Sequence, residues 1–141
     1  MRTLWLAMLI SLGTASCART DAPDEPVWGK QACAQCAMLV SDKRYAAQLL
    51  ADGERRYFDD IGCLAAFVLE HAGHAEQAAS TSKSWVRYAQ SASWIEARLA
   101  HYASGAKTPM DYGYEARSDG TMTWPVVLGQ VTRRNRQELR P

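Results

Sequence analysis

Residues 45–69, with the sequence YAAQLLADGERRYFDDIGCLAAFVL, decide the expected fold of this 141-residue chain. Two stretches with strand character, residues 45–50 and 55–58, flank the pair Asp52-Gly53. Both residues of the pair tolerate a positive φ angle, which a tight hairpin turn requires. The sequence therefore predicts an antiparallel hairpin, although the alanines of its first strand weaken the strand signal.

A helix is predicted directly after this hairpin. Asp59 or Asp60 is suited to cap it, because a carboxylate accepts the free amides of the first helical turn. Gly73 fits the left-handed position after the last turn. Cys63 lies beside the apolar stripe, and we interpret it as a small buried residue rather than a ligand. The stripe has helical spacing and comprises Ile61, Leu64, Ala65, Val68 and Leu69.

Further strand and helix signals lie on both sides of this unit. Short strands are predicted at residues 38–40, 85–89 and 112–116. Residues 94–102 suit either a helix or a strand. Thr123 can cap a closing helix that has Pro125 in its first turn. Each half of the chain is therefore expected to hold strands followed by a helix, which predicts an α+β fold.

The first residues have the pattern of an export signal. A basic residue, an apolar run at residues 4–10 and several small residues precede Cys17. The run is too short to span a bilayer as a mature helix. A cysteine directly after small residues resembles a bacterial lipoprotein box, in which cleavage before Cys17 leaves that thiol carrying a lipid. Ordinary cleavage after Ala18 stays open, because Thr14 departs from the usual leucine.

These signals divide the chain into six parts and place it at a membrane surface. The expected parts are a signal peptide (1–16), a lipid-anchored tether (17–30), a first half (31–74), a linker (75–84), a second half (85–132) and a basic tail (133–141). A lipid on Cys17 would anchor the protein on the periplasmic side of a membrane without spanning it. The net charge of +1 gives no reason to expect nucleic acid as a partner.

The sequence Cys33-Ala34-Gln35-Cys36-Ala37-Met38 carries the clearest chemical signal. A tight turn brings two thiols three residues apart close together, and the chain leaving the turn can direct Met38 to the same point. Thiolates and thioethers are soft donors, which select Cu(I). Three alternatives stay open from spacing alone: a structural disulfide, a redox pair, or half of a zinc site. Met38 is also compatible with an ordinary place in the core.

Two further sulfur residues bear on this signal. If Cys17 carries a lipid, Cys33, Cys36 and Cys63 remain, and an odd number of thiols cannot all pair within one chain. Met110 follows Pro109, which stiffens its neighbourhood by fixing φ. Met110 becomes a candidate donor only if the fold brings it to Cys36 and Met38.

Four separated motifs, in one order, resemble the NosL family of nitrous oxide reductase accessory proteins. They are Cys33-x-x-Cys36-Ala37-Met38-x-Val40, Tyr57-Phe58-Asp59-Asp60-Ile61-Gly62, Trp94-Ile95-Glu96-Ala97, and Thr108-Pro109-Met110 before Tyr112-Gly113. The resemblance runs from about Cys33 to Arg117. Family members usually have Gly at the position of Ala37 and Asp at that of Glu96.

The resemblance implies an α+β fold of two similar ββαβ-like halves, each a short antiparallel sheet with a helix packed on it. It also implies a membrane-anchored Cu(I) chaperone that delivers copper to a periplasmic enzyme, with nitrous oxide reductase as the expected acceptor. Cys36 and Met38 are then the first-choice metal ligands and Met110 is their partner from the second half. Cys33 is a further donor or a resolving thiol.

Three other functions compete with a copper carrier. A thiol-disulfide oxidoreductase would use Cys33 as its nucleophile, with a lowered pKa. A zinc-binding module would need two ligands beyond the Cys pair, and the sequence has no second C-x-x-C or C-x-x-H motif. A structural lipoprotein would hold a Cys33–Cys36 disulfide. No catalytic triad, phosphate loop or paired-carboxylate pattern stands out, so we expect a protein that is not an enzyme.

Overall fold

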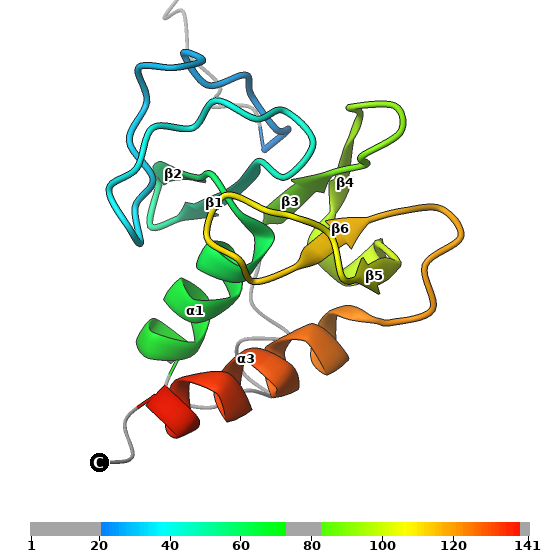
Figure 1. The fold of residues 1–141 in the computed structure, drawn as a ribbon. Coiled ribbons are helices and arrows are strands. Elements are labelled where there is room, and N and C mark those ends of the chain that lie inside the picture. The colour runs from blue at the N-terminus through cyan, green and yellow to red at the C-terminus, as the bar shows by residue number, and fades with distance from the viewer. Residues whose placement is uncertain (1–20, 73–82, 139–141) are drawn as a thin grey trace, which may run out of the picture.

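The structure, a computed structural model, describes residues 21–72 and 83–138 (Figure 1). These residues form two antiparallel sheets and two α-helices, which confirms the expected α+β class. The expected signal peptide, Cys17, most of the linker and the last three residues lie outside the described part of the chain. Within the described ranges, neither helix has the length and apolar character needed to cross a bilayer.

The larger sheet is built around the predicted hairpin. Strands β1 (Ala47–Ala51) and β2 (Glu54–Phe58) pair antiparallel, and the turn residues Asp52 and Gly53 have φ angles of 52° and 73°. Strand β3 (Ser84–Arg87) pairs with the other edge of β1, and β4 (Trp94–Glu96) pairs with β3. The strand order is β2-β1-β3-β4, so this sheet joins strands from both halves of the chain.

The smaller sheet contains only β5 (Tyr102–Ser104) and β6 (Tyr114–Ala116). The ambiguous segment 94–102 is divided among β4, a single 3-10 turn η1 (Ala97–Leu99) and the first residue of β5. The strand expected at residues 38–40 is not formed, and only an isolated bridge between Ala32 and Leu39 is present there. Leu39 is 53% exposed, so among the described residues it has little of the packing that would favour a strand here.

Helix α1 (Ile61–Ala72) begins where the sequence predicts it. Asp60 accepts a hydrogen bond from the amide of Gly62 through Oδ1 at 2.8 Å, so Asp60 rather than Asp59 caps the helix. Helix α3 (Trp124–Glu138) follows Thr123 and carries Pro125 in its first turn. It continues beyond residue 132, where the sequence placed the start of a basic tail. An i,i+4 ion pair between Arg134 and Glu138 supports this extension.

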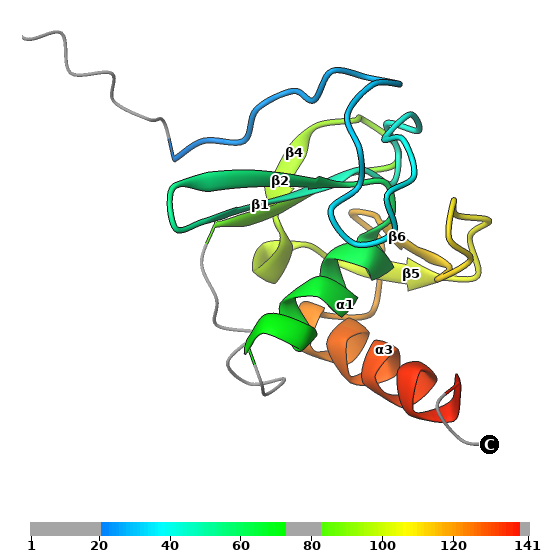
Figure 2. The ribbon, with the colours of Figure 1, turned by 90° about the vertical axis from the view of Figure 1, so that its left-hand side faces the viewer.

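The two helices share one core with both sheets. α1 packs against α3, and Figure 2 shows both helices on one side of the larger sheet, with the segment that begins at residue 21 on the other side. The largest fully buried side chains come from both halves of the chain and include Phe58, Ile61, Leu64, Tyr102, Trp124 and Leu128. The α1 side of this core supports the residues described next.

Candidate metal centre

The turn that carries Cys33 and Cys36 is held by backbone hydrogen bonds. The amide of Ala37 donates to the Cys33 carbonyl at 3.0 Å, and the amide of Cys33 donates to the Met38 carbonyl at 2.8 Å. Ala37 closes the turn with a φ angle of 63°, a left-handed conformation that is unfavourable for residues with a Cβ atom. The amide of Ala34 donates to the Tyr57 carbonyl at 2.8 Å, which fastens the turn to the end of β2.

The junction between β2 and α1 supplies two more donors to the same place. Asp59 directly follows β2, and Cys63 lies in the first turn of α1. One oxygen of Asp59 and the sulfur atoms of Cys33, Cys36 and Cys63 all lie within 4.8 Å of one another. The Cys36 thiol donates a hydrogen bond to Asp59 Oδ1 at 3.3 Å. Donors separated by up to 30 residues therefore form one cluster, compatible with a bound metal ion.

The cluster is shielded from solvent on all but one side. Cys33 is 3% exposed, Asp59 is 2% exposed and Cys63 is fully buried. Cys36 is only partly buried. An ion or a reagent from solvent would therefore meet the Cys36 sulfur first.

Hydrogen bonds and burial set the protonation of the three thiols. A hydrogen bond from the Cys63 thiol, together with backbone amides of the turn, lowers the pKa of Cys33 to about 6. Burial, aided by the neighbouring Cys33 and Asp59, raises the pKa of Cys36 to about 12. Donation to Cys33 and burial raise the pKa of Cys63 well above its usual range. One thiolate and two thiols are therefore the stable arrangement near neutral pH without a metal.

The two methionines that the sequence proposed as ligands are more exposed than Cys33 and Cys63. The Met38 side chain is 57% exposed and follows the cysteine turn directly. Met110 is half-buried, and its amide donates a hydrogen bond to Asp60 Oδ2 at 3.0 Å. The assignment of Met38 and Met110 as metal ligands stays a prediction, whereas Cys33 and Cys36 lie in the cluster.

A close contact fixes the Met110 loop on α1. Tyr112 packs on Gly62, where an added Cβ atom would lie 1.9 Å from the Tyr112 ring. Only glycine therefore fits at this position of α1. Since Gly62 is next to Cys63, the loop from the second half of the chain lies beside the residues that carry the cluster.

Two members of the cluster, Asp59 and Cys63, are not predicted as ligands from the sequence. Cys63 was interpreted as a small core residue, and Asp59 only as a helix cap. Cys63 is buried, as expected, and Asp59 is buried too, and both donor atoms belong to the cluster with the cysteine turn. The odd number of thiols was the one signal that could have included Cys63. All three described cysteines are free in the structure, and none forms the disulfide considered from the sequence.

No family model, curated protein or solved structure matches this chain. The resemblance to the NosL family stays a prediction. The function must therefore be argued from the donor set itself. Three sulfur atoms and one carboxylate oxygen suit a soft or borderline metal ion, and do not suit Mg²⁺ or Ca²⁺, which take oxygen ligands.

Proposed function

We propose that this chain is an exported carrier of Cu(I), not an enzyme, and that it holds the ion between Cys33, Cys36 and Cys63. The observation that supports this proposal is the convergence of their three sulfur atoms and an Asp59 oxygen within 4.8 Å. Three sulfur atoms bound to one ion at about 2.3 Å in a trigonal arrangement lie about 4.0 Å apart, so the separations of the thiols need to change by no more than about 1 Å. Soft thiolates are the ligands that Cu(I) prefers.

The exposure of the site suits transfer of the ion to another protein. Cys36 is the most accessible of the three thiols, and Met38 lies exposed beside the turn. A ligand from an acceptor can join the ion at this side before a resident ligand leaves. The thioether of Met38 is neutral and adds a soft donor at the point of exchange. On this proposal copper is cargo that passes through the open side of the cluster.

Thiol-disulfide exchange is less well supported. The thiolate is the nucleophile in such reactions and must reach its substrate. Cys33 has the lowered pKa but is 3% exposed, whereas the accessible Cys36 has a raised pKa. The reactive form and the accessible position therefore belong to different residues.

Zinc is a second candidate cargo or structural ion, favoured by Asp59. The sequence has no second ligand pair, but the fold adds Cys63 and the Asp59 carboxylate to the Cys33–Cys36 pair. Three thiolates and one carboxylate oxygen can provide the four ligands of tetrahedral Zn²⁺. Cu(I) would leave Asp59 outside a three-sulfur site, because a carboxylate is a hard ligand.

The proposed acceptor rests on the motifs that resemble the NosL family, and the proposed location rests on the lipoprotein-like start of the sequence. A lipid on Cys17 would hold the protein on the periplasmic side of a bacterial membrane. Nitrous oxide reductase is the acceptor that the NosL-like motifs favour, and another exported copper enzyme is the alternative. Co-purification of the full-length chain with candidate acceptors, with and without Cu(I), tests this part of the proposal separately.

X-ray absorption of the reduced protein loaded separately with Cu(I) and Zn²⁺ tests the ion and its ligands. We expect only sulfur scatterers around Cu(I), from the three cysteines and the Met38 thioether, and competition with a chelator should give the higher affinity for Cu(I). A site with oxygen in the first shell and a higher affinity for Zn²⁺ would instead favour the zinc alternative. Absence of binding to either metal would refute a metal-binding function.

A further inference from the structure

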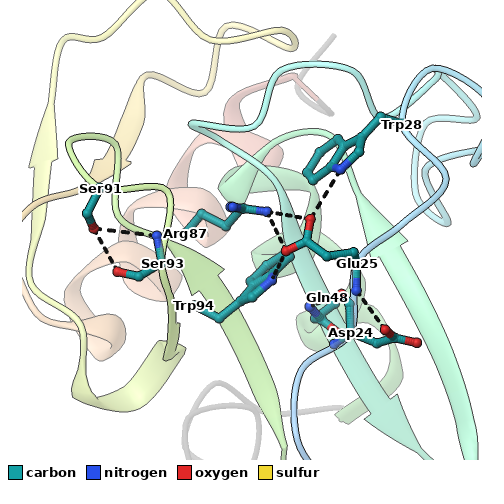
Figure 3. A network of polar contacts seen from close by, with 8 residues as sticks. All are labelled: Asp24, Glu25, Trp28, Gln48, Arg87, Ser91, Ser93 and Trp94. Carbon is teal, nitrogen blue, oxygen red and sulfur yellow. Dashed lines mark hydrogen bonds and ion pairs between the residues drawn. The ribbon is translucent and has the colours of Figure 1, made fainter.

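The carboxylate of Glu25 is bound by three side chains: the nearby Trp28, and Arg87 and Trp94 from a distant part of the chain (Figure 3). Arg87 Nη1 donates to both oxygens, at 2.9 Å to Oε1 and 2.8 Å to Oε2. The indole N–H groups of Trp94 and Trp28 donate to Oε1 at 2.9 Å and to Oε2 at 3.1 Å. Glu25 therefore accepts four hydrogen bonds, although its side chain is 54% exposed.

Arg87 depends on this carboxylate for its charge compensation. The residue is 7% exposed, and its guanidinium lies 4.8 Å from the centre of the Trp94 ring and 5.3 Å from that of Trp28. Its Nε atom is buried without a hydrogen-bond partner. A buried charge that loses its partner is strongly unfavourable. Removal of the Glu25 charge should therefore disrupt the whole contact and not merely weaken one ion pair.

Glu25 belongs to a segment, residues 21–28, that crosses the face of the larger sheet opposite α1. Asp24 exchanges two hydrogen bonds of 3.0 Å with the fully buried side chain of Gln48 on β1. Arg55 on β2 donates to the Ala22 carbonyl at 2.8 Å, and Lys83 pairs with Asp21. With Arg87 on β3 and Trp94 on β4, the segment has contacts with every strand of this sheet. We name residues 21–28 the strap.

The strap leads without a break into the cysteine turn. The Val27 carbonyl accepts the amide of Gln31 at 2.9 Å, and the Gln31 carbonyl accepts the amide of Val40 at 2.9 Å. The amide of Gly29 donates to the Val40 carbonyl at 2.9 Å. Residues 27–40 contain no helix or strand, so these bonds and the strap, together with the bond from the Ala34 amide to the Tyr57 carbonyl, determine where the first half of the metal centre lies.

We infer that Glu25 is a positioning residue, which fastens the strap to Arg87 and Trp94 and so holds the Cys33–Cys36 turn against Asp59 and Cys63. Two of the cluster's thiols come from the segment that the strap holds, while Asp59 and Cys63 belong to the β2–α1 junction. Release of the strap would leave the turn held by its direct bonds, such as those from Ala34 to Tyr57 and from Gln35 to Glu70, and would loosen the two parts without unfolding the core. The effect on metal affinity rests on the proposed function, whereas the effect on the thiols themselves does not.

The test is the variant Glu25→Gln in the full-length, reduced protein, with Glu54→Gln as its matched control. Glu54 is also exposed and paired with an arginine, but its partner, Arg56, belongs to the same strand, β2. The first measurement is the rate at which a thiol reagent labels Cys33, which is 3% exposed in the intact fold. The second is Cu(I) affinity by chelator competition, and circular dichroism reports whether the helices and sheets remain.

We expect Glu25→Gln to label Cys33 at least tenfold faster and to bind Cu(I) about tenfold more weakly, which is the usual effect of losing a residue that orients a metal ligand. Glu54→Gln should match the wild type in both measurements. Faster labelling with unchanged affinity, or no change in either measurement, would overturn the inference. If the wild type binds no Cu(I), only the proposed function fails. The role of Glu25 is then still tested by the labelling of Cys33, and an unchanged rate in Glu25→Gln would overturn it.

Discussion

The backbone amide of Met110 donates a hydrogen bond to the carboxylate of Asp60 at 3.0 Å, across 50 residues of sequence. The same carboxylate caps α1 through Gly62, and the hydroxyl of Thr108 also donates to it. One buried side chain thus joins the start of the helix that carries Cys63 to the loop that carries the second candidate methionine. Burial raises the pKa of Asp60, and these hydrogen bonds oppose that effect.

Thr108→Val should destabilise the protein by about 1–3 kcal/mol, because it removes a hydrogen bond to the buried Asp60 and leaves the Gly113 amide without its acceptor. Urea denaturation measures the change in the free energy of unfolding. Thr121→Val is the control, since Thr121 is exposed and its substitution should change stability by less than about 0.5 kcal/mol. Equal effects for both variants would show that the Asp60 contacts do not stabilise the loop.

Cys63→Ala separates metal binding from packing. We expect Cu(I) affinity to fall by more than about tenfold, since loss even of an outer partner of a metal ligand costs this much. The sulfur count from X-ray absorption should fall by one. Val68→Ala is the control, because Val68 is buried in the same helix and its truncation costs stability but no donor. An unchanged Cu(I) affinity in Cys63→Ala would restore the interpretation of Cys63 as a core residue.

Met38→Ala tests the thioether beside the open side of the cluster. Met38 is 57% exposed, so its truncation should change stability little. We expect Cu(I) affinity to fall by about tenfold while Zn²⁺ affinity stays nearly unchanged, because a thioether is a ligand for soft ions. Leu39→Ala removes a neighbouring side chain of similar exposure, 53%, and should affect neither metal. Equal losses for Cu(I) and Zn²⁺ in Met38→Ala would remove its role in selectivity.

The affinity for Cu(I) should rise with pH. Cys33 is already deprotonated above a pKa of about 6, whereas the pKa of Cys36 is about 12 and that of Cys63 is raised further. Binding by all three sulfurs must therefore release the protons of Cys36 and Cys63. Between about pH 7 and pH 9 we expect an increase of about 100-fold in affinity per pH unit, measured by chelator competition. A pH-independent affinity would mean that Cu(I) binds without these two thiolates.

Ala37→Gly should stabilise the cysteine turn. The φ angle of 63° costs a residue with a Cβ atom about 1–2 kcal/mol, and the greater freedom of glycine in the unfolded chain offsets about 0.5–1 kcal/mol of the gain. The net increase in unfolding free energy should be up to about 1 kcal/mol by urea denaturation. Ala34→Gly, in the same turn but without a positive φ angle, should instead destabilise the protein. A loss of stability in both variants would contradict this explanation.

Local signals made much of the fold predictable. The Asp52-Gly53 turn, the cap at the start of α1 and the apolar stripe of that helix depend on neighbours close in sequence, and the structure confirms all three. The isolated bridge at Leu39 and the division of residues 94–102 depend on which elements cover them, which no local pattern specifies. The end of α3 was also missed, because Arg134 is held by the Asp111 carbonyl at 2.8 Å as well as by Glu138.

The candidate site was predictable only in part, for a related reason. The spacing of Cys33 and Cys36 placed both thiols in one turn, and the structure brings both into the cluster. Asp59 and Cys63 each had a sufficient local explanation, as a cap and as a core residue, so nothing in the sequence required a second role. Their convergence with the turn depends on the bond between Ala34 and Tyr57, which is a property of the folded chain.

The position of β1 at the middle of the larger sheet has a consequence for any attempt to divide the protein. Its two pairing partners, β2 and β3, come from opposite sides of residues 73–82. A piece that ends before residue 73 would leave the β1 edge open to pairing with other chains, and the complementary piece would lack most of this sheet. The two pieces should therefore be insoluble or unfolded when expressed singly and regain the native state only by fragment complementation.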